Sequence, residues 1–365
     1  MTTVHVAFGG YGGTHAGAER MAWRTTARLA TRGHRMTVVT DSAPPAGLDR
    51  DAVRVAPAAE GARPGPGGTP PDLVHAYDLG QPEHVGRALT AARTHRVPFV
   101  LTPATDPQLW PDPALGRAAC EQASVIYTLT AAEETVLRSA GAPADRMRRI
   151  AQAPDLTGSP DGAAFRARHG IAGPMVLFAG RRIATKGYRQ FLACAPRVWD
   201  RLPDTVFALI GPGGEPERDP AREAIRTDPR VRDLGTVSDQ DKFDAMAACD
   251  VFALPTTADV FPLVFTEAWA CGRPVVTGRF PGVGEVVRDG VDGVIIGPGS
   301  DELADVLLAL LTDRGRRESM GAAGLLRSRT EFGWDRVADD VAAGYRAALT
   351  LRPPAAAGQK ERDTG

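Results

Sequence analysis

The sequence predicts an α/β protein made of two doubly wound, Rossmann-like domains that face each other across a central cleft. Short apolar runs of strand length alternate with helical stretches, which is typical of parallel sheets joined by helices. This alternation ends near Asp155 and then starts again, so the chain holds two such units. The chain has 365 residues, enough for two or three domains of about 100–200 residues each.

The first unit opens with an apolar strand at residues 4–8, followed by a glycine-rich loop at residues 9–17. Apolar positions at helical spacing come next, and Gly33 fits the C-terminus of that helix. Further strands are predicted at residues 36–40, 73–75, 99–102 and 125–129. The stretch 57–71 is rich in Gly and Pro without periodicity, so we predict a surface loop there.

The second unit contains predicted strands at residues 175–179, 206–210, 251–254, 274–276 and 294–296. Predicted helices cover residues 188–199, 241–248, 263–270 and 302–311. We expect an N-terminal domain at 1–155, a C-terminal domain at 156–335, a helix at 336–350 that returns to the first domain, and a disordered tail at 351–365. Ligands of such folds bind beyond the carboxyl ends of the strands, so functional side chains should follow the strands.

Charge and composition exclude several function classes. The 43 basic residues balance 44 acidic ones without forming a basic block, which argues against a nucleic-acid or membrane-surface partner. No apolar run reaches the roughly 20 residues that a membrane span needs. The N-terminus lacks the pattern of a secretion signal, so we expect a cytoplasmic protein. The four cysteines are widely spaced, which favours free thiols over a zinc site.

The glycine-rich loop after the first strand predicts close approach of the backbone to a ligand phosphate. Gly10 and Gly12 begin a dinucleotide-binding pattern, but His15 stands where its third glycine belongs. Asp41 would suit the ribose of a dehydrogenase cofactor, so that alternative stays open. His15 is a candidate ligand-facing group or an ordinary loop histidine.

The loop at residues 180–187 predicts a diphosphate site, because Arg181 offers a planar fork and Lys186 a compact charge. Only three of the 43 basic residues are lysines. A solvated basic position in such a chain would be arginine, so a specific contact is expected to retain Lys186. The alternative is a solvated pair at a helix start, where cations are poorly placed unless an anion is present.

A third feature surrounds the helix predicted at 263–270. Glu267 lies on its apolar side, where a carboxylate is costly unless it accepts hydrogen bonds, and a ribose diol offers two donors. Asp259 lies on the preceding loop and could contact a bound sugar. A salt bridge would explain either acid equally well.

Together these segments resemble the retaining glycosyltransferases of family four (glycosyltransferase group 1), which have the GT-B fold. The likeness to their C-terminal domain rests on residues 180–187, 210–213, 234–238 and 259–276. The likeness to their N-terminal domain rests on residues 17–20, 29–34 and 72–76.

The resemblance implies sugar transfer from a nucleotide diphosphate sugar to a small-molecule acceptor, with retention of configuration and without a metal or cofactor. Arg181 and Lys186 would clamp the diphosphate, Glu267 would bind the ribose, and Asp259 would contact the donor sugar. The implied donor site also includes Gly17, Gly211, Val237, Leu263 and Val264. Asp239 and Asp241 form an Asp-x-Asp pair of the kind that binds metal in other transferases, but their place at a helix start favours capping.

Ala104 stands where the family has an active-site histidine. His15, His75 or Asp106 could face the sugar or acceptor in its place. The change also admits two alternatives, a transferase that forms a bond other than an O-glycoside and a non-catalytic binder of nucleotide sugars. The Arg- and Ala-rich composition suggests bacterial specialised metabolism.

Overall fold

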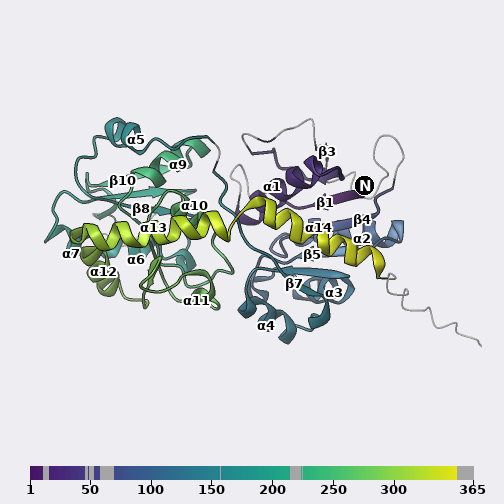
Figure 1. The fold of residues 1–365 in the computed structure, drawn as a ribbon. Coiled ribbons are helices and arrows are strands. Elements are labelled where there is room, and N and C mark those ends of the chain that lie inside the picture. Colours follow the sequence, from purple (N-terminus) through teal and green to yellow (C-terminus); the bar gives the residue numbers. More distant parts are fainter. Residues whose placement is uncertain are drawn as a thin grey trace, which may run out of the picture.

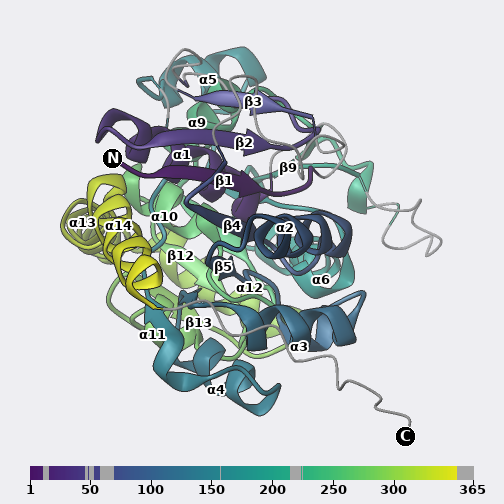
Figure 2. The ribbon, with the colours of Figure 1, turned by 90° about the vertical axis from the view of Figure 1, so that its right-hand side faces the viewer.

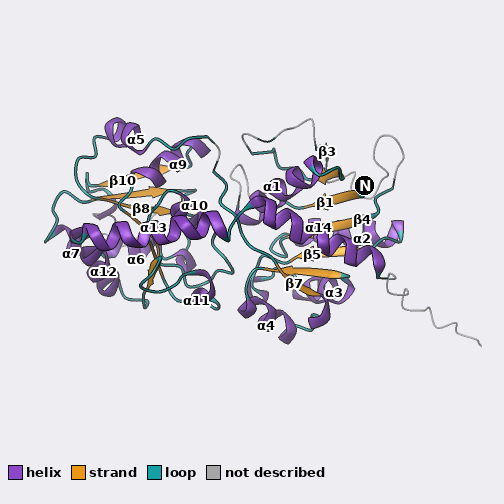
Figure 3. Cartoon of the chain, in the orientation of Figure 1, coloured by secondary structure: helices purple, strands orange, loops and turns teal. Residues whose placement is uncertain are grey.

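The computed structural model describes residues 1–10, 16–45, 48, 53–57, 70–156, 158–213, 223 and 225–351. These residues form two parallel β-sheets, each packed between helices, and the two halves lie side by side (Figures 1 and 3). The predicted α/β class with two doubly wound domains is confirmed. None of the described helices is both long and apolar enough to cross a lipid bilayer.

The first sheet has the strand order β3-β2-β1-β4-β5-β6-β7, with all pairs parallel. Its strands are β1 (Thr3–Ala7), β2 (Arg35–Val39), β3 (Arg54–Ala56), β4 (Leu73–Tyr77), β5 (Phe99–Thr102), β6 (Val125–Thr128) and β7 (Met147–Arg149). The helices of this half are α1 (Gly17–Thr31), α2 (Pro82–His95), α3 (Pro113–Gln122) and α4 (Ala131–Ser139), with the 3-10 turns η2 (Pro107–Leu109) and η3 (Ala144–Arg146).

The second sheet has the order β10-β9-β8-β11-β12-β13, again with all pairs parallel. Its strands are β8 (Met175–Ala179), β9 (Val206–Ile210), β10 (Val231–Gly235), β11 (Val251–Leu254), β12 (Val275–Thr277) and β13 (Gly293–Ile295). Its helices are α5 (Gly162–His169), η4 (Ala184–Lys186), α6 (Tyr188–Ala193), α7 (Ala195–Trp199), α9 (Asp239–Ala248), α10 (Leu263–Ala270), α11 (Val283–Val286), α12 (Ser300–Thr312) and α13 (Arg314–Thr330).

One predicted helix is divided in two. Residues 188–199 form α6 and α7, which meet at Cys194. Pro196 has no backbone N–H to donate, so an unbroken helix would lose a hydrogen bond at this point.

In each sheet, the order in which strands are added reverses at one strand, and this reversal determines where a ligand can bind. β1 lies between β2 and β4, and β8 lies between β9 and β11, so successive connections run to opposite sides of β1 and of β8. In doubly wound sheets, the crevice at such a reversal lies outside the carboxyl ends of the two central strands. The loops after β1, β4, β8 and β11 are therefore the expected binding loops.

The helix α14 (Trp334–Thr350) connects the two halves. It follows α13 along one side of the molecule and lies against α1 and β6 (Figures 1 and 2). Where α14 begins, the indole nitrogen of Trp334 donates to the carbonyl oxygen of Pro154 at 2.9 Å. Residues 58–69 of the predicted loop and 352–365 of the predicted tail lie outside the described residues, and the domain boundaries at 155, 335 and 350 stay predictions.

Candidate active site

A cavity of about 470 Å³ lies between the carboxyl ends of the two sheets. From the first half, its wall includes the start of α1 and the beginnings of the loops after β4, β5 and β6. From the second half, it includes the loops after β8, β9, β10 and β11 and the start of α10. The topology of the sheets predicts a site in this place.

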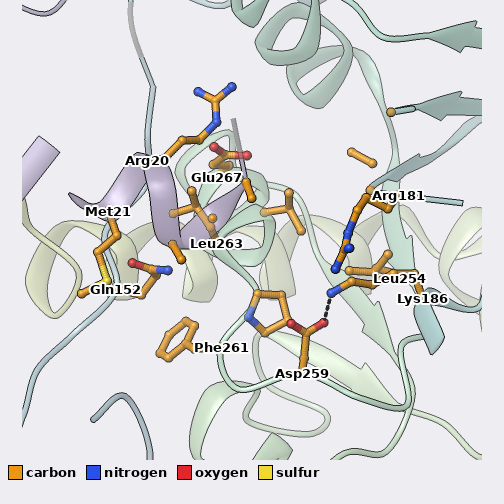
Figure 4. A pocket seen from close by; sticks show the side chains of 18 of the residues that line it. Arg20, Met21, Gln152, Arg181, Lys186, Leu254, Asp259, Phe261, Leu263 and Glu267 are labelled. Carbon is orange, nitrogen blue, oxygen red and sulfur yellow. Dashed lines mark hydrogen bonds and ion pairs between the residues drawn. The ribbon is translucent and has the colours of Figure 1, made fainter. Parts of the chain in front are cut away.

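Arg181 and Lys186 both line this cavity from the loop after β8. The guanidinium of Arg181 and the ammonium of Lys186 point toward the same spot (Figure 4). The loop turns at Gly187, directly after Lys186, with a φ of +73°. A larger residue would not fit there, because its Cβ would lie 2.2 Å from the carbonyl oxygen of Pro255. Two cationic side chains that face the same part of a cavity favour an anionic ligand there.

Asp259 lies beside these cations at the cavity wall. Its Oδ2 is 2.5 Å from Nζ of Lys186 and accepts a hydrogen bond from the hydroxyl of Thr256 at 3.1 Å. The carboxylate is therefore fixed at the cavity wall from two sides.

Glu267 is fully buried on α10 and lines the same cavity. Its Oε1 accepts from Nζ of Lys242 at 2.7 Å, but its Oε2 has no hydrogen-bond partner among the described residues. Burial raises the pKa of Glu267, while the nearby charges of Lys242 and Arg20 oppose that rise. An unpartnered buried oxygen costs about 1–3 kcal/mol, so a ligand hydroxyl that donates to Oε2 would be favourable.

The other residues predicted for the donor site line the same cavity; they are Gly17, Gly211, Val237, Leu263 and Val264. A Cβ on Gly17 would lie 3.6 Å from the Cβ of Leu263, so the starts of α1 and α10 meet here. The first N–H groups of a helix have no acceptor within it and can face an anionic ligand.

His75 does not line the cavity, so its predicted contact with sugar or acceptor is corrected. The side chain is fully buried, with Nδ1 at 2.8 Å from the hydroxyl of Tyr345 and Nε2 at 2.9 Å from that of Thr102. Burial lowers the pKa of His75 to about 3, which keeps the ring neutral. Its role is to tie α14 to the first sheet.

Of the other two candidates for that contact, one also lies outside the cavity wall. Asp106 is the N-cap of η2, where its Oδ1 accepts from the backbone N–H of Gln108 at 2.8 Å, and it is not part of the cavity wall. His15 lies outside the described residues.

Arg20 also lines the cavity, although no sequence pattern marks it as a site residue. From α1 it forms ion pairs with Asp155, at 2.6 Å, and with Asp239 on α9, at 2.5 Å. Burial opposes the charge of Arg20, but hydrogen bonding to Asp239 and nearby acids raise its pKa overall. Asp155 also pairs with Arg24. These contacts span 135 and 219 residues of sequence, so no local pattern indicates them, and the pair with Asp239 connects the two halves.

The predicted helix start at the Asp-x-Asp pair is present, but neither acid is the N-cap. Ser238 caps α9 by accepting from the backbone N–H of Asp241 at 3.1 Å. In the described ranges, no group of three or more His, Cys, Asp or Glu side chains is placed to hold a metal ion.

Three further residues line the cavity from the first half and the connection between the halves. Asp78 and Ala104 follow the neighbouring strands β4 and β5, and both have positive φ, +69° and +56°. The backbone strain of such residues is often found at functional sites. Gln152 is 3% exposed, lines the cavity near Met21 (Figure 4), and its Oε1 has no partner among the described residues.

Known proteins share this architecture. The protein HepE of Anabaena, solved in complex with UDP and glucose, superimposes with a TM-score of 0.76 at 21% identity, over 95% of this chain and 100% of that one. Sucrose-phosphate synthase of Thermosynechococcus elongatus gives a TM-score of 0.76 at 17% identity, over 95% of this chain and 98% of that one. The chain therefore has the GT-B fold.

The sequence comparison finds relatives for part of the chain. Residues 173–313, in the second half, match the family model described as "Glycosyl transferases group 1". A D-inositol 3-phosphate glycosyltransferase of Xylanimonas cellulosilytica is 36% identical over 253 residues, which cover 64% of this chain and 59% of that protein.

An alpha-D-kanosaminyltransferase of Streptomyces kanamyceticus is 27% identical over 239 residues, which cover 63% of this chain and 62% of that protein. Across three of the curated relatives, the chain spans only 59%, 44% and 47% of their lengths.

Proposed function

We propose that the protein is a glycosyltransferase that moves a sugar from a nucleotide diphosphate sugar to a small-molecule acceptor, with retention of configuration and without a metal ion. One observation carries this proposal. Arg181 and Lys186 converge in a single interdomain cavity that also contains the carboxylates of Asp259 and Glu267. This combination suits a ligand with a diphosphate in its middle and hydroxyl groups at both ends.

The donor would lie along the second half of the cavity. Its diphosphate would contact Arg181 and Lys186, and the backbone amides at Leu263 and Val264 would add donors from the start of α10. The ribose hydroxyls would donate to Glu267, whose Oε2 has no partner among the described residues. The loops at Gly211 and Val237 would flank the base.

The chemistry follows from this placement of charge. The bond between the anomeric carbon and the diphosphate oxygen breaks, the acceptor oxygen bonds to the same face of that carbon, and the acceptor proton leaves with the diphosphate. Negative charge grows on the diphosphate in the transition state, where fixed cations and amides stabilise it. Asp259 would contact the transferred sugar and stabilise positive charge that develops on it.

The similar proteins support this proposal at a coarser level. HepE was solved with UDP and glucose. Three of the curated relatives are named as a D-inositol 3-phosphate glycosyltransferase, a phosphatidyl-myo-inositol mannosyltransferase and an alpha-D-kanosaminyltransferase. A nucleotide sugar as donor and a small molecule as acceptor agree with those names. The kanosamine relative also agrees with a place in specialised metabolism.

A second candidate function rests on Ala104. Because this residue lines the cavity and carries no polar group, the reaction lacks a side-chain base at this point of the wall. An acceptor that is itself a good nucleophile, such as a thiol or an amine, would need less help from the protein.

The first test is a thermal-shift screen with UDP-, GDP-, dTDP- and ADP-sugars in the presence of EDTA. We expect one of these donors to raise the melting temperature of the wild type, and Lys186→Met to lose most of that rise. Arg314→Met, which removes an exposed cation on α13, is the matched control and should keep it. No stabilisation by any of the donors would contradict the proposal.

The product then distinguishes the two candidate functions. Mass spectrometry after incubation with hydroxyl, thiol and amine acceptors should find the hydroxyl product for the main proposal and a thiol or amine product for the second. Donor binding without any product would instead indicate a non-catalytic binder.

A further inference from the structure

A lysine on α9 lines the cavity beside Glu267. Lys242 follows the loop after β10 that also brings Val237 to the cavity wall. Its Nζ donates to Oε1 of Glu267 at 2.7 Å, and its side chain is 12% exposed. The pair therefore joins α9 and α10 at the wall on which the donor is proposed to lie.

The presence of a lysine at this position is informative in itself. Only three of the 43 basic residues in the chain are lysines. Lys186 and Lys242 are the two lysines among the described residues, and both line this cavity. An ammonium is a compact charge with three rotatable donors, whereas a guanidinium is a broad, flat fork. This arginine-rich chain thus has compact cations at its cavity wall.

The contacts of Lys242 and Glu267 leave a donor and an acceptor for a ligand. An ammonium has three N–H groups, and the hydrogen bond to Glu267 uses one of them. No other described residue accepts a hydrogen bond from Nζ, whose further contact is the ring of Phe243 at 4.6 Å. On Glu267, Oε2 is buried and has no partner among the described residues.

This donor and this acceptor suit an uncharged group with two hydroxyls. The charges of the ammonium and the carboxylate already offset each other, so the pair attracts a further phosphate weakly. A vicinal diol fits, because one hydroxyl can donate to Oε2 of Glu267 while the other accepts from Nζ of Lys242. Both hydrogen bonds involve a charged group, and such bonds are stronger than those between neutral groups.

We propose that Lys242 is a further donor-binding residue, which hydrogen-bonds to the 2′-hydroxyl of the nucleotide and so selects ribonucleotide donors over 2′-deoxyribonucleotide donors. This inference rests on the proposed function, because it takes Glu267 as the ribose site. A 2′-deoxyribonucleotide, such as the carrier of a dTDP-sugar, lacks one of the two hydroxyls and loses the hydrogen bond from Nζ.

The elements that carry the two residues assign the two hydroxyls. Lys242 stands on α9, after the loop with Val237 that would flank the base. Glu267 stands on α10, whose start would face the diphosphate. In a nucleotide, the 2′-carbon is bonded to the carbon that bears the base, and the 3′-carbon to the carbon that bears the phosphate arm. Lys242 is thus on the side of the 2′-hydroxyl and Glu267 on the side of the 3′-hydroxyl.

Matched pairs of nucleotides test this selection without a known sugar or acceptor. Calorimetric titrations of the full chain would use UDP, GDP and ADP, each beside its 2′-deoxy form, together with dTDP. Within a pair, only one hydroxyl differs. For the base that binds most tightly, we expect the ribonucleotide to bind the wild type at least tenfold more tightly than its deoxy form, because the lost hydrogen bond is to a charged group.

Variants separate this contact from a structural role. Lys242→Met should bring the affinity ratio of the pair close to one, whereas loss of a structural contact would weaken both nucleotides equally. Lys186→Met should weaken both nucleotides and keep their ratio, and Arg314→Met, which removes an exposed cation, should keep both affinities. If Lys242→Met does not fold, the double variant with Glu267→Gln removes both charges of the pair and should give the same ratio.

Three results overturn the inference. They are tightest binding of dTDP, equal affinities within the pair that binds best, and a ratio that survives in Lys242→Met. In each of these cases nucleoside diphosphates still bind, so the proposed function stands. If none of these nucleotides binds, the proposed function itself fails, and the inference fails with it.

Discussion

Two buried glutamates show how the surroundings of a residue set its pKa. Burial raises the pKa of both Glu267 and Glu133. For Glu267, the charges of Lys242 and Arg20 oppose the rise and favour the carboxylate. For Glu133, on α4, the opposing groups are backbone N–H donors such as that of Leu129 at 2.6 Å, and its Oε1 has no partner among the described residues. The pKa of Glu133 is therefore raised to about 7.

Because of Glu133, the free energy of unfolding should fall as the pH rises. Between its unfolded pKa near 4.5 and its folded pKa of about 7, the native state binds a proton that the unfolded state has lost. The free energy of unfolding should therefore fall by about 3 kcal/mol from pH 5 to pH 8, relative to Glu133→Gln. Urea unfolding at several pH values measures this difference, with the exposed Glu83→Gln as control. Parallel pH curves for wild type and Glu133→Gln would refute the assignment.

At the scale of elements, local sequence patterns predict the central strands well. Strands such as β1, β4, β8 and β9 are buried at every position and appear in the sequence as short apolar runs. The edge strands β3 and β7 have only three residues each, and β7 ends in the exposed Arg148 and Arg149, so no apolar pattern indicates them. The docking of α14 likewise depends on distant partners.

The packing of α14 gives a prediction at this scale. A Cβ on Gly344 would lie 2.1 Å from the hydroxyl oxygen of Tyr127, which itself donates to the carbonyl oxygen of Val341 at 2.5 Å. Gly344→Ala should destabilise the protein by about 1–3 kcal/mol, although alanine favours helices. Gly86→Ala on α2 is the control, because its Cβ would meet only ordinary contacts from 3.6 Å. Equal stabilisation of both variants by alanine would contradict the close packing.

At the scale of the whole molecule, the site forms only where the two halves pack against each other, because both of them line the cavity. The sequence indicates the cavity residues that follow β8 and β11, because each stands on a loop or helix that comes after a recognisable strand. These residues are Arg181, Lys186, Asp259 and Glu267. The sequence does not predict the ion pairs of Arg20, since its partners Asp155 and Asp239 lie far away in the sequence, and the second of them is on α9 of the other half.

No sequence pattern indicates the cavity residues Asp78 and Gln152 either. Asp78 follows a predicted strand without any motif around it, and Gln152 belongs to the connection between the halves. Only the folded chain shows that both residues face the cavity containing Arg181 and Lys186.

The central claim is that Arg181 and Lys186 bind a diphosphate, and a titration tests it most directly. Calorimetry would measure the dissociation constants of a nucleoside diphosphate and of the monophosphate with the same base, for the wild type, Lys186→Met and Arg314→Met. The wild type and Arg314→Met should prefer the diphosphate by tenfold or more, as expected for one additional charge-assisted contact of about 1.5–3 kcal/mol. Lys186→Met should lose most of this preference. Equal affinities in the wild type, or an unchanged preference in Lys186→Met, would contradict the account.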